Sequence, residues 1–215
     1  MLSSRSAAAW VVVLIAAIGL PAIGPSSDDA GWQVLERARR DLGRSGALSA
    51  QFTQTYTPAG FSSGDSESGT LALRLPDCLR WDYDEPFPKS FLLCGTSAYS
   101  WNPGETSGRY QQIDPASEPG LDLLLLATDE LKNRYRAELL ERPDDETAVR
   151  LEPVVPEAVG LVEAILVLSA AEGRLGRLRY RDLDGNLTVF QLSGYEPLAD
   201  SNRFEPPDEL RWQED

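Results

Sequence analysis

Apolar and polar residues alternate along most of the chain, in short runs that end at Gly, Pro, Asn or Asp. This period of two is typical of β-strands that turn one face toward a core. It predicts strands at about 48–57, 70–75, 79–83, 89–94, 97–102, 108–113, 134–142, 147–152, 161–169, 174–182 and 186–193. One more short strand is expected in the tail, near Phe204 or Leu210.

Two segments depart from this alternation. Residues 31–44, "GWQVLERARRDLGR", place Trp32, Leu35 and Leu42 on one stripe among charged residues, which indicates an amphipathic helix. Residues 121–126 are nearly all leucine. This run is too short for a helix that stands alone, so we expect one or two helical turns there.

The connections between the predicted strands are short and polar. A Gly/Ser-rich stretch at 60–68 predicts a hairpin loop, and the dipeptide Asp184-Gly185 is a strong signal for a tight hairpin turn. The sequence shows no internal repeat, linker or second domain. The pattern therefore predicts a mainly β (α+β) protein with about ten antiparallel strands. We expect them to form a single curved, partly closed sheet with two small helical patches.

The N-terminus has the order of a secretory signal peptide. Arg5 precedes the apolar run "AAAWVVVLIAAIGL", and small residues follow around Ala22 and Gly24. The alternative is a membrane anchor, but a span needs about 20 apolar residues and this run is shorter. We expect residues 1–24 to be a cleaved signal peptide and residues 25–215 to form one exported domain.

Residues 71–95, "LALRLPDCLRWDYDEPFPKSFLLCG", predict a hairpin that carries a disulfide. If this stretch folds back at its middle, Trp81 meets Phe91 and Cys78 meets Cys94. Side chains alternate along a strand, so the aromatic pair lies on one face and the two cysteines on the other, at a separation that a disulfide spans. Because an exported chain meets oxidising conditions, we predict a cross-strand disulfide.

Composition excludes several classes of function. The formal net charge is −14, and no basic run interrupts it, so nucleic acid and anionic membrane surfaces are poor partners. The chain contains no histidine, which excludes Ser-His-Asp and Cys-His catalysis and most zinc sites. We expect no metal, no cofactor and no enzymatic activity.

Clusters of acidic residues are the remaining candidates for catalysis. Asp82, Asp84 and Glu85 straddle a predicted hairpin end, and residues 144–146 are acidic and lie in a predicted turn. Solvated turn carboxylates account for both clusters. An enzyme that acts on a lipid or glycan through such a pair of carboxylates stays open as an alternative.

A set of apolar side chains on consecutive strands forms the candidate binding site. Nine of them lie at positions whose parity places them on one face: Leu71, Leu73, Leu79, Trp81, Tyr83, Phe91, Leu93, Tyr99 and Trp101. Two interpretations stay open. The set is an ordinary core, or the two small helices do not fill the concave side and leave an apolar cavity. The ligand of such a cavity would be an acyl chain or another long hydrophobe.

Several motifs occur in a recognisable order. They are "LSAQFTQTYT", "SGTLALRLPDCLRWDYDEP", "CGTSAYSWNP", "RYQQIDP", "LDLLLLATDEL", "RYRDLDGNLTVFQLSGYEP" and "RFEPP". In this order and spacing they resemble the outer-membrane lipoprotein carrier family, LolA, over about residues 32–212. That family works in the periplasm, which agrees with the predicted signal peptide.

The resemblance implies a single curved antiparallel sheet that forms an incomplete β-barrel, with short helices as a lid over an apolar cavity. It also implies positions for the functional residues. Trp81 would lie inside an apolar cavity, with Leu79 near its mouth. The lid would contain Leu123, Leu124, Leu125 and Leu126. Family members often carry Lys-Arg-Pro at the end of the second strand, where the arginine hydrogen-bonds the lid backbone. Here Leu75 takes the place of that arginine, so the lid must be held differently.

The resemblance also implies a function and partners. The protein would bind the acyl chains of lipoproteins that an inner-membrane transporter releases, and would carry them to an outer-membrane acceptor. We expect it to act as a monomer. A carrier or sensor of another lipid, such as an exported glycolipid or polyene, stays open because Leu75 replaces the family arginine.

Overall fold

A computed structural model of the 215-residue chain describes residues 27–140, 146–169, 173–199 and 201–214. The predicted signal peptide, residues 1–24, lies outside the described residues, and so do residues 144 and 145 of the second acidic cluster. Among the helices of the described ranges, none is long and apolar enough to cross a membrane.

Strands dominate the described part of the chain. They are β1 (Leu48–Thr57), β2 (Asp65–Arg74), β3 (Cys78–Glu85), β4 (Lys89–Cys94), β5 (Ser97–Trp101), β6 (Ser107–Gln112), β7 (Tyr135–Leu140), β8 (Thr147–Pro153), β9 (Leu161–Leu168), β10 (Leu175–Asp182), β11 (Leu187–Pro197) and β12 (Arg211–Glu214). The α-helices are α1 (Ser27–Arg44), α2 (Leu121–Leu125), α3 (Thr128–Arg134) and α4 (Pro156–Val159). Two 3-10 helices are η1 (Pro115–Ser117) and η2 (Ser201–Phe204).

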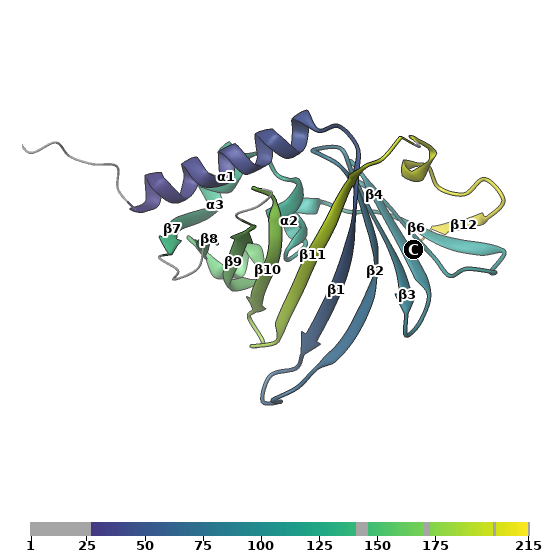
Figure 1. Ribbon diagram of the computed structural model, residues 1–215. Coiled ribbons are helices and arrows are strands. Elements are labelled where there is room, and N and C mark those ends of the chain that lie inside the picture. The colour runs from purple at the N-terminus through teal and green to yellow at the C-terminus, as the bar shows by residue number, and fades with distance from the viewer. Residues whose placement is uncertain (1–26, 141–145, 170–172, 200, 215) are drawn as a thin grey trace, which may run out of the picture.

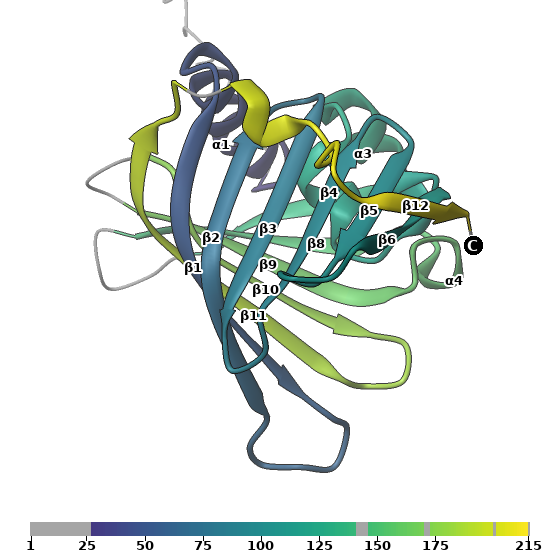
Figure 2. The ribbon, with the colours of Figure 1, turned by 90° about the vertical axis from the view of Figure 1, so that its right-hand side faces the viewer.

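The twelve strands form one curved sheet that does not close. Its order is β12-β6-β5-β4-β3-β2-β1-β11-β10-β9-β8-β7, so β12 and β7 are the two edges in the part of the chain that the structure describes. Figures 1 and 2 show the sheet bending around one side of the molecule. The predicted incomplete barrel, a mainly β fold with short helices, is therefore confirmed.

The hairpin of β3 and β4 has the predicted register. Trp81 pairs with Phe91, and Cys78 pairs with Cys94. The structure contains the predicted cross-strand disulfide between the two cysteines, with a sulfur–sulfur distance of 2.07 Å. Alternation along the strands then places the disulfide on the face opposite the aromatic pair.

Four elements differ from the sequence-based expectation. Strand β2 begins at Asp65, inside the stretch predicted as a loop, because it pairs with β1 as far as the Tyr56–Asp65 pair. The first two residues of β2, Asp65 and Ser66, are exposed, so no alternation of apolar and polar residues marks them as a strand. The predicted tail strand lies at 211–214, directly after Leu210, but it pairs in parallel with β6 instead of antiparallel. Helices α3 and α4 were not predicted.

Helix α1 covers one end of the sheet, near β7 and α3 (Figure 1). Its apolar stripe packs into the main core through Trp32, Leu35 and Leu42. Gly31 allows the helix to approach the sheet closely, because a Cβ at this position would lie 3.1 Å from the Cβ of Ala137. The predicted amphipathic helix is therefore present, and it starts four residues earlier than expected.

The two faces of the sheet carry separate apolar clusters. The face that bears Trp81, called the inner face here, contributes to the main core together with α1, α2 and α3. The opposite or outer face bears Trp101, and it is covered by residues 198–199 and 201–214, called the C-terminal segment here. Figure 2 shows this segment crossing the sheet in front of β3 and β4.

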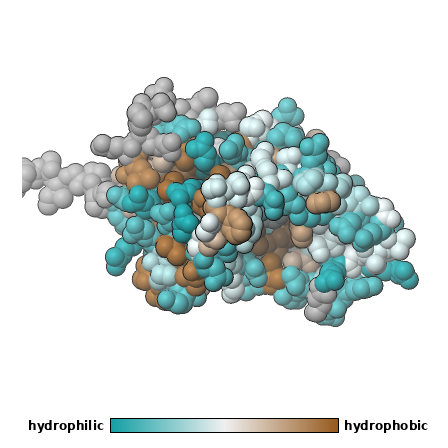
Figure 3. All heavy atoms as spheres, turned by 90° about the horizontal axis from the view of Figure 1, so that it is seen from below, coloured by the Kyte–Doolittle hydropathy of each residue, from teal (hydrophilic) through white to brown (hydrophobic). Residues whose placement is uncertain are grey.

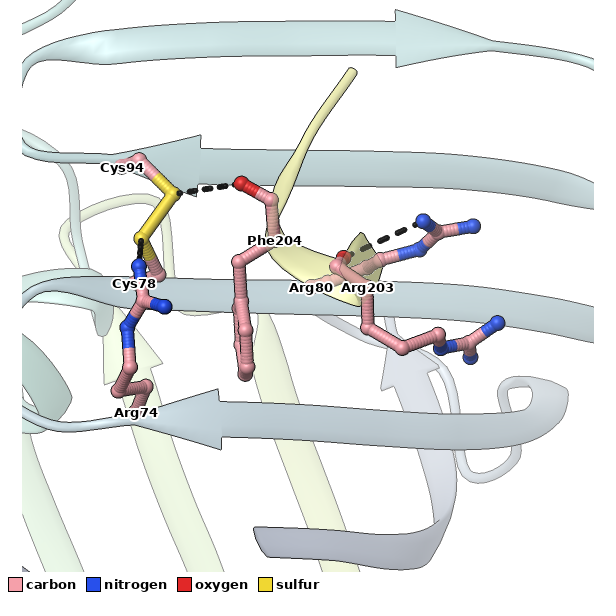
Figure 4. The surroundings of a disulfide bond; sticks show 6 residues. All are labelled: Arg74, Cys78, Arg80, Cys94, Arg203 and Phe204. Carbon is pink, nitrogen blue, oxygen red and sulfur yellow. Dashed lines mark hydrogen bonds between the residues drawn. A yellow bond between two sulfur atoms is a disulfide. The ribbon is translucent and has the colours of Figure 1, made fainter. Parts of the chain in front are cut away.

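The disulfide lies beneath the C-terminal segment on the outer face (Figure 4). Phe204 is buried there, with the guanidinium carbon of Arg74 4.7 Å from the centre of its ring. The Sγ atom of Cys94 lies 3.6 Å from the carbonyl oxygen of Phe204. Arg80 donates a hydrogen bond of 3.2 Å to the carbonyl oxygen of Arg203. The outer face around the disulfide is thus covered by the chain itself.

Candidate functional site

The inner face leaves an apolar cavity of about 350 Å³. Its lining residues are Gln54, Leu71, Trp81, Tyr83, Phe91, Leu92, Leu93, Ala98, Tyr99, Gln111, Ile113, Glu118, Pro119, Gly120, Leu121, Leu124, Leu175, Leu178, Tyr180, Phe190 and Leu192. Most of these side chains are aliphatic or aromatic. Figure 3, which views the molecule from below, shows a hollow with hydrophobic walls. The volume falls in the range of about 300–1,000 Å³ that is usual for small-molecule sites.

Two groups of elements enclose this cavity. The inner face of the sheet forms one wall of the cavity. Residues 115–134, which we call the roof segment, line the opposite side. Of the nine predicted site residues, five line the cavity with inner-face positions: Leu71, Trp81, Tyr83, Phe91 and Leu93. Their role in binding a ligand remains a prediction.

Two predicted residues share the inner face but do not line the cavity. Leu73 and Leu79 are buried in the main core, where they pair across β2 and β3. Leu79 also pairs with Leu93 near the end of the hairpin that carries the disulfide. The expectation that Leu79 lies near the cavity mouth is therefore wrong, because packed side chains surround it.

The placement of Tyr99 and Trp101 on the inner face is also wrong. The tight turn after β4 pairs Leu92 with Tyr99 and Ser90 with Trp101. To share a face with Phe91 and Leu93, Tyr99 and Trp101 would have to pair with odd-numbered residues of β4. The observed register is shifted by one residue, and such a shift turns a side chain to the other face. Tyr99 still borders the cavity, but its ring packs against Trp212 on the outer face, with ring centres 5.0 Å apart.

The roof segment divides its leucines between the cavity and the core. Leu121 and Leu124 line the cavity. Leu123 and Leu125 are buried in the main core, and Leu126 packs against that core from a partly buried position. Among the four predicted lid leucines, Leu124 is thus the one that meets the cavity, while the others hold the segment in place.

Arg39 of α1 joins the roof segment to the rest of the molecule. Its guanidinium donates hydrogen bonds to the backbone carbonyl oxygens of Leu123 at 2.9 Å and Leu124 at 3.3 Å, and to that of Leu126. Burial lowers the pKa of the Arg39 guanidinium from its ordinary, very high value. One partly buried cation therefore holds the carbonyl groups at the end of α2, where a helix lacks internal partners.

Arg39 was not among the predicted site residues. The replacement of the family arginine by Leu75 predicted a different way of holding the lid, and in the structure Leu75 packs against the main core near Arg39. One signal was available in the sequence. Arg39 falls between Leu35 and Leu42 on the apolar stripe of the helix, where a charged residue is costly unless it finds partners.

A second polar anchor lies beneath the roof segment. Asp122 is fully buried, and its carboxylate accepts hydrogen bonds from the hydroxyl of Tyr135 and from the backbone N–H of Leu123 at 2.8 Å. Arg134 lies 3.6 Å from the same carboxylate. Burial raises the pKa of Asp122, and these partners offset part of that effect. The cluster ties the start of α2 to β7.

A few polar groups interrupt the cavity wall. Tyr83 donates a hydrogen bond to the side-chain oxygen of Gln54. Burial raises the pKa of Tyr83 and also that of Tyr180, so both phenols stay neutral in ordinary conditions. Neutral phenols and amides can orient the polar end of a ligand without repelling it. The lining also includes one carboxylate, that of Glu118.

The first acidic cluster has structural partners on the outer face. Asp82 accepts hydrogen bonds from Arg80 at 2.9 Å, Ser90 at 2.6 Å and Arg203 at 2.6 Å. These contacts fasten the C-terminal segment to the sheet. Within the described residues, no group of three or more Cys, Asp or Glu side chains is placed to hold a metal ion.

Comparison with known sequences identifies relatives of this chain. Residues 44–206 match the family described as "Outer membrane lipoprotein carrier protein LolA". The outer-membrane lipoprotein carrier protein of Shewanella loihica is 24% identical over 155 residues, which cover 72% of this chain and 71% of that protein.

Comparison with solved structures supports the fold. An uncharacterized conserved protein from Thermus thermophilus superposes with a TM-score of 0.56 at 8% identity, over 86% of this chain and 99% of that one. A DUF1329 family protein from Desulfovibrio piger gives a TM-score of 0.52 at 12% identity, over 87% of this chain and all of that one. At such identities the likeness concerns the fold alone.

Proposed function

Because the chain belongs to the outer membrane lipoprotein carrier family LolA, we propose that it is a periplasmic carrier that takes up the acyl chains of lipoproteins in its inner cavity. One observation carries the proposal. The inner face of the sheet leaves an unfilled apolar cavity of about 350 Å³, and a roof segment that is hydrogen-bonded to Arg39 covers it. Members of this family are carriers and not enzymes, and the mostly aliphatic and aromatic lining of the cavity agrees with that role.

Reversible binding is the physical problem of such a carrier. Burial of a methylene group yields about 0.8 kcal/mol, so a chain of sixteen carbons gains roughly 13 kcal/mol in a dry and rigid cavity. A cargo with several chains would then be released too slowly. The free energy of binding must therefore be reduced by something that the ligand displaces.

The roof segment is the competing occupant in our proposal. Leu121 and Leu124 fill part of the space that a longer chain needs, so a full-length acyl chain moves them. Opening the roof segment also breaks the hydrogen bonds from Arg39 to the carbonyl groups of α2. These lost contacts subtract from the affinity and make delivery possible.

The cargo itself tests the proposal. We expect acylated polypeptide to co-purify with the protein from the periplasm and to be identified by mass spectrometry. Free glycolipid or polyene in its place would contradict the lipoprotein role and would support the alternative of another lipid cargo. Transfer from an inner-membrane transporter to an outer-membrane acceptor, by a monomer, completes the proposal.

A substitution in the roof segment tests the mechanism. We expect Leu124→Asp to loosen the empty state and to speed the uptake of a fluorescent fatty acid, because the lid loses apolar contact with the cavity. Leu210→Asp is the matched control, since Leu210 is also a partly buried leucine but packs on the outer face. Unchanged uptake and unchanged stability in Leu124→Asp would count against a lid.

A further inference from the structure

A second hollow, of about 200 Å³, lies near the β5–β6 connection. Unlike the inner cavity, it is lined mainly by polar side chains, among them Lys89, Ser100, Asn102, Ser107, Arg109 and Gln213. We call it the polar hollow. Phe91 lines both the polar hollow and the inner cavity. The two spaces are therefore neighbours that share a wall residue.

The strand register places a row of the polar hollow's side chains on the same face of the sheet as the inner cavity. Phe91, which faces inward with Trp81, pairs with Ser100 of β5. Ser100 pairs with Arg109 of β6, and Arg109 pairs with Gln213 of β12. Residues that pair directly across strands share a face, so this row lies on the inner face. Figure 2 shows the four strands β4, β5, β6 and β12 in succession.

The next row of the same strands lines the inner cavity. Leu93 pairs with Ala98, and Ala98 pairs with Gln111. All three residues belong to the lining of the cavity. Each lies two positions along its strand from a residue of the polar row, which is a distance of about 7 Å. An amphiphile whose hydrocarbon chain occupies the cavity can thus place its polar end in the polar hollow.

The charged side chains of the polar hollow already have partners in the protein. Lys89 forms an ion pair with Glu67 at 2.6 Å, and its Nζ atom lies 4.5 Å from the centre of the Tyr83 ring. Arg109 is also engaged within the protein. Among the described lining residues, an anionic headgroup therefore finds no unengaged cation. The exposed carboxylate of Glu105, which is part of the lining, would repel it.

The remaining groups suit a polypeptide backbone. Every peptide unit except that of proline carries one N–H donor and one C=O acceptor, and the side chains of Ser100, Ser107 and Gln213 carry groups of both kinds. The polar row also ends at β12, which is an edge of the sheet in the described part of the chain. An edge strand can pair with an extended segment through its outward backbone groups. A polypeptide that leaves the hollow beside Gln213 thus meets further hydrogen-bonding partners.

From this arrangement we infer that the polar hollow binds the polypeptide next to the acylated residue of the cargo, while the acyl chain occupies the inner cavity. The inference rests on the proposed function and adds to it a site for the polypeptide part of the cargo. A free hydrocarbon chain fills the cavity alone and gains nothing from the hollow. The protein should therefore distinguish an acylated peptide from a simple acyl amide.

Competition between matched ligands tests the polar hollow. The probes are palmitamide and a palmitoylated tripeptide with an amidated end, which have the same chain and are both neutral. Each displaces a fluorescent fatty acid from the purified protein, and the displacement gives its dissociation constant. We expect the palmitoylated peptide to bind about tenfold more tightly, which corresponds to one or two net hydrogen bonds.

A substitution in the polar row with a matched control sharpens the test. Ser100→Leu places an apolar side chain beside Phe91 and should weaken binding of the palmitoylated peptide about tenfold, with binding of palmitamide unchanged. Ser97→Leu is the control. Ser97 is another half-buried serine of β5, but it pairs with Cys94 of the outer-face disulfide. Equal losses in both variants would overturn the inference, since a general change in β5 would then explain them.

A second variant keeps the test valid if Ser100→Leu does not fold. Gln213→Leu changes an exposed residue at the far end of the polar row and should weaken binding of the palmitoylated peptide about threefold. Unchanged binding of this peptide by the folded Gln213→Leu protein would count against a polypeptide that leaves the hollow at β12.

Two further ligands decide between polar groups of different chemistry. They are palmitoyl lysophosphatidylglycerol and hexadecyl maltoside. If either binds more tightly than the palmitoylated peptide, and Ser100→Leu removes that difference, the hollow holds a lipid headgroup or a sugar and the inference is overturned. Equal binding of all probes refutes the polar hollow alone. Displacement of the fluorescent fatty acid by none of them refutes the proposed carrier function.

Discussion

The two faces of strands β3, β4 and β5 are both apolar but are covered in different ways. On the outer face, Trp101 packs edge to face against Trp212, with ring centres 5.9 Å apart. Trp212 lies directly on Gly108, where a Cβ would be 2.3 Å from its ring. On the inner face, Trp81 borders a cavity of about 350 Å³ beneath the roof segment.

The comparison shows that hydrophobic content does not identify a binding site. Trp81 and Trp101 are each 9% exposed, and both come from the same small set of strands. The C-terminal segment covers Trp101, beside which lies the polar hollow, a smaller space of about 200 Å³ with several polar residues in its lining, whereas the roof segment leaves a larger space with a mostly apolar lining beside Trp81. An unfilled space that also has an apolar lining, and not apolar surface alone, is the feature that points to an apolar ligand.

The largest expected effect comes from the two tryptophans. Trp101→Ala should reduce the free energy of unfolding by about 3–5 kcal/mol, because it empties a filled site. Trp81→Ala should cost less, about 1–3 kcal/mol, since part of its surroundings is already open. Only Trp81→Ala should alter fatty-acid binding. Urea unfolding and fluorescence titration check both, and equal losses of stability would show that the inner face is packed like the outer one.

Removal of the disulfide should have the next largest effect. Cys78→Ser with Cys94→Ser opens a link between residues 16 positions apart and should cost about 2–4 kcal/mol. The bond lies on the outer face, so the folded variant should bind fatty acid as the unsubstituted protein does. Denaturant unfolding measures the loss. Altered binding in the folded variant would show that the two faces are coupled.

Arg39 provides a test on the inner face. Arg39→Met leaves three carbonyl groups of the roof segment without their donor, which should cost about 1–3 kcal/mol. Because the roof segment then opens more easily, uptake of fatty acid should become faster. Arg37→Met removes an exposed arginine of the same helix and serves as the control. Slower uptake in Arg39→Met would mean that Arg39 shapes the cavity instead of holding its cover.

The hairpin that carries the disulfide could be predicted because local rules determine it. Strong alternation and a short turn set the register of Trp81 and Cys78 with their partners. The same reasoning failed at Trp101, one turn later. There the Gly95-Thr96 turn pairs Cys94 with Ser97, and this register places Trp101 on the outer face.

The contacts of the roof segment could not be predicted from local pattern. Arg39 meets Leu123 across 84 positions of sequence, and the path of α1 over the sheet decides that contact. The parallel pairing of the tail with β6 is likewise a long-range event, since nothing in the four residues 211–214 specifies a direction. Local periodicity gave the strands, and tertiary packing decided which of their faces stayed unfilled.

The smallest expected effect concerns Asp122 and the pH dependence of the inner face. Burial raises the pKa of Asp122 in the folded protein above its value in the unfolded chain, where it has the ordinary value of about 4. The folded state therefore binds this proton more tightly. The stability that protonated Asp122 contributes is fully present below the unfolded pKa and is lost as the pH rises through the folded pKa.

The comparison of the protein with Asp122→Asn isolates this contribution, because asparagine does not titrate. We expect the unfolding free energy of the unsubstituted protein, minus that of Asp122→Asn, to decrease as the pH rises from about 3 to about 8. Urea unfolding of both proteins at several pH values measures this difference. Asp129→Asn, which removes an exposed carboxylate from the same roof segment, shows the effect of losing one charge alone. An advantage that grows with pH would mean that Tyr135 and Arg134 outweigh burial, and that the roof segment is anchored by the ionised carboxylate.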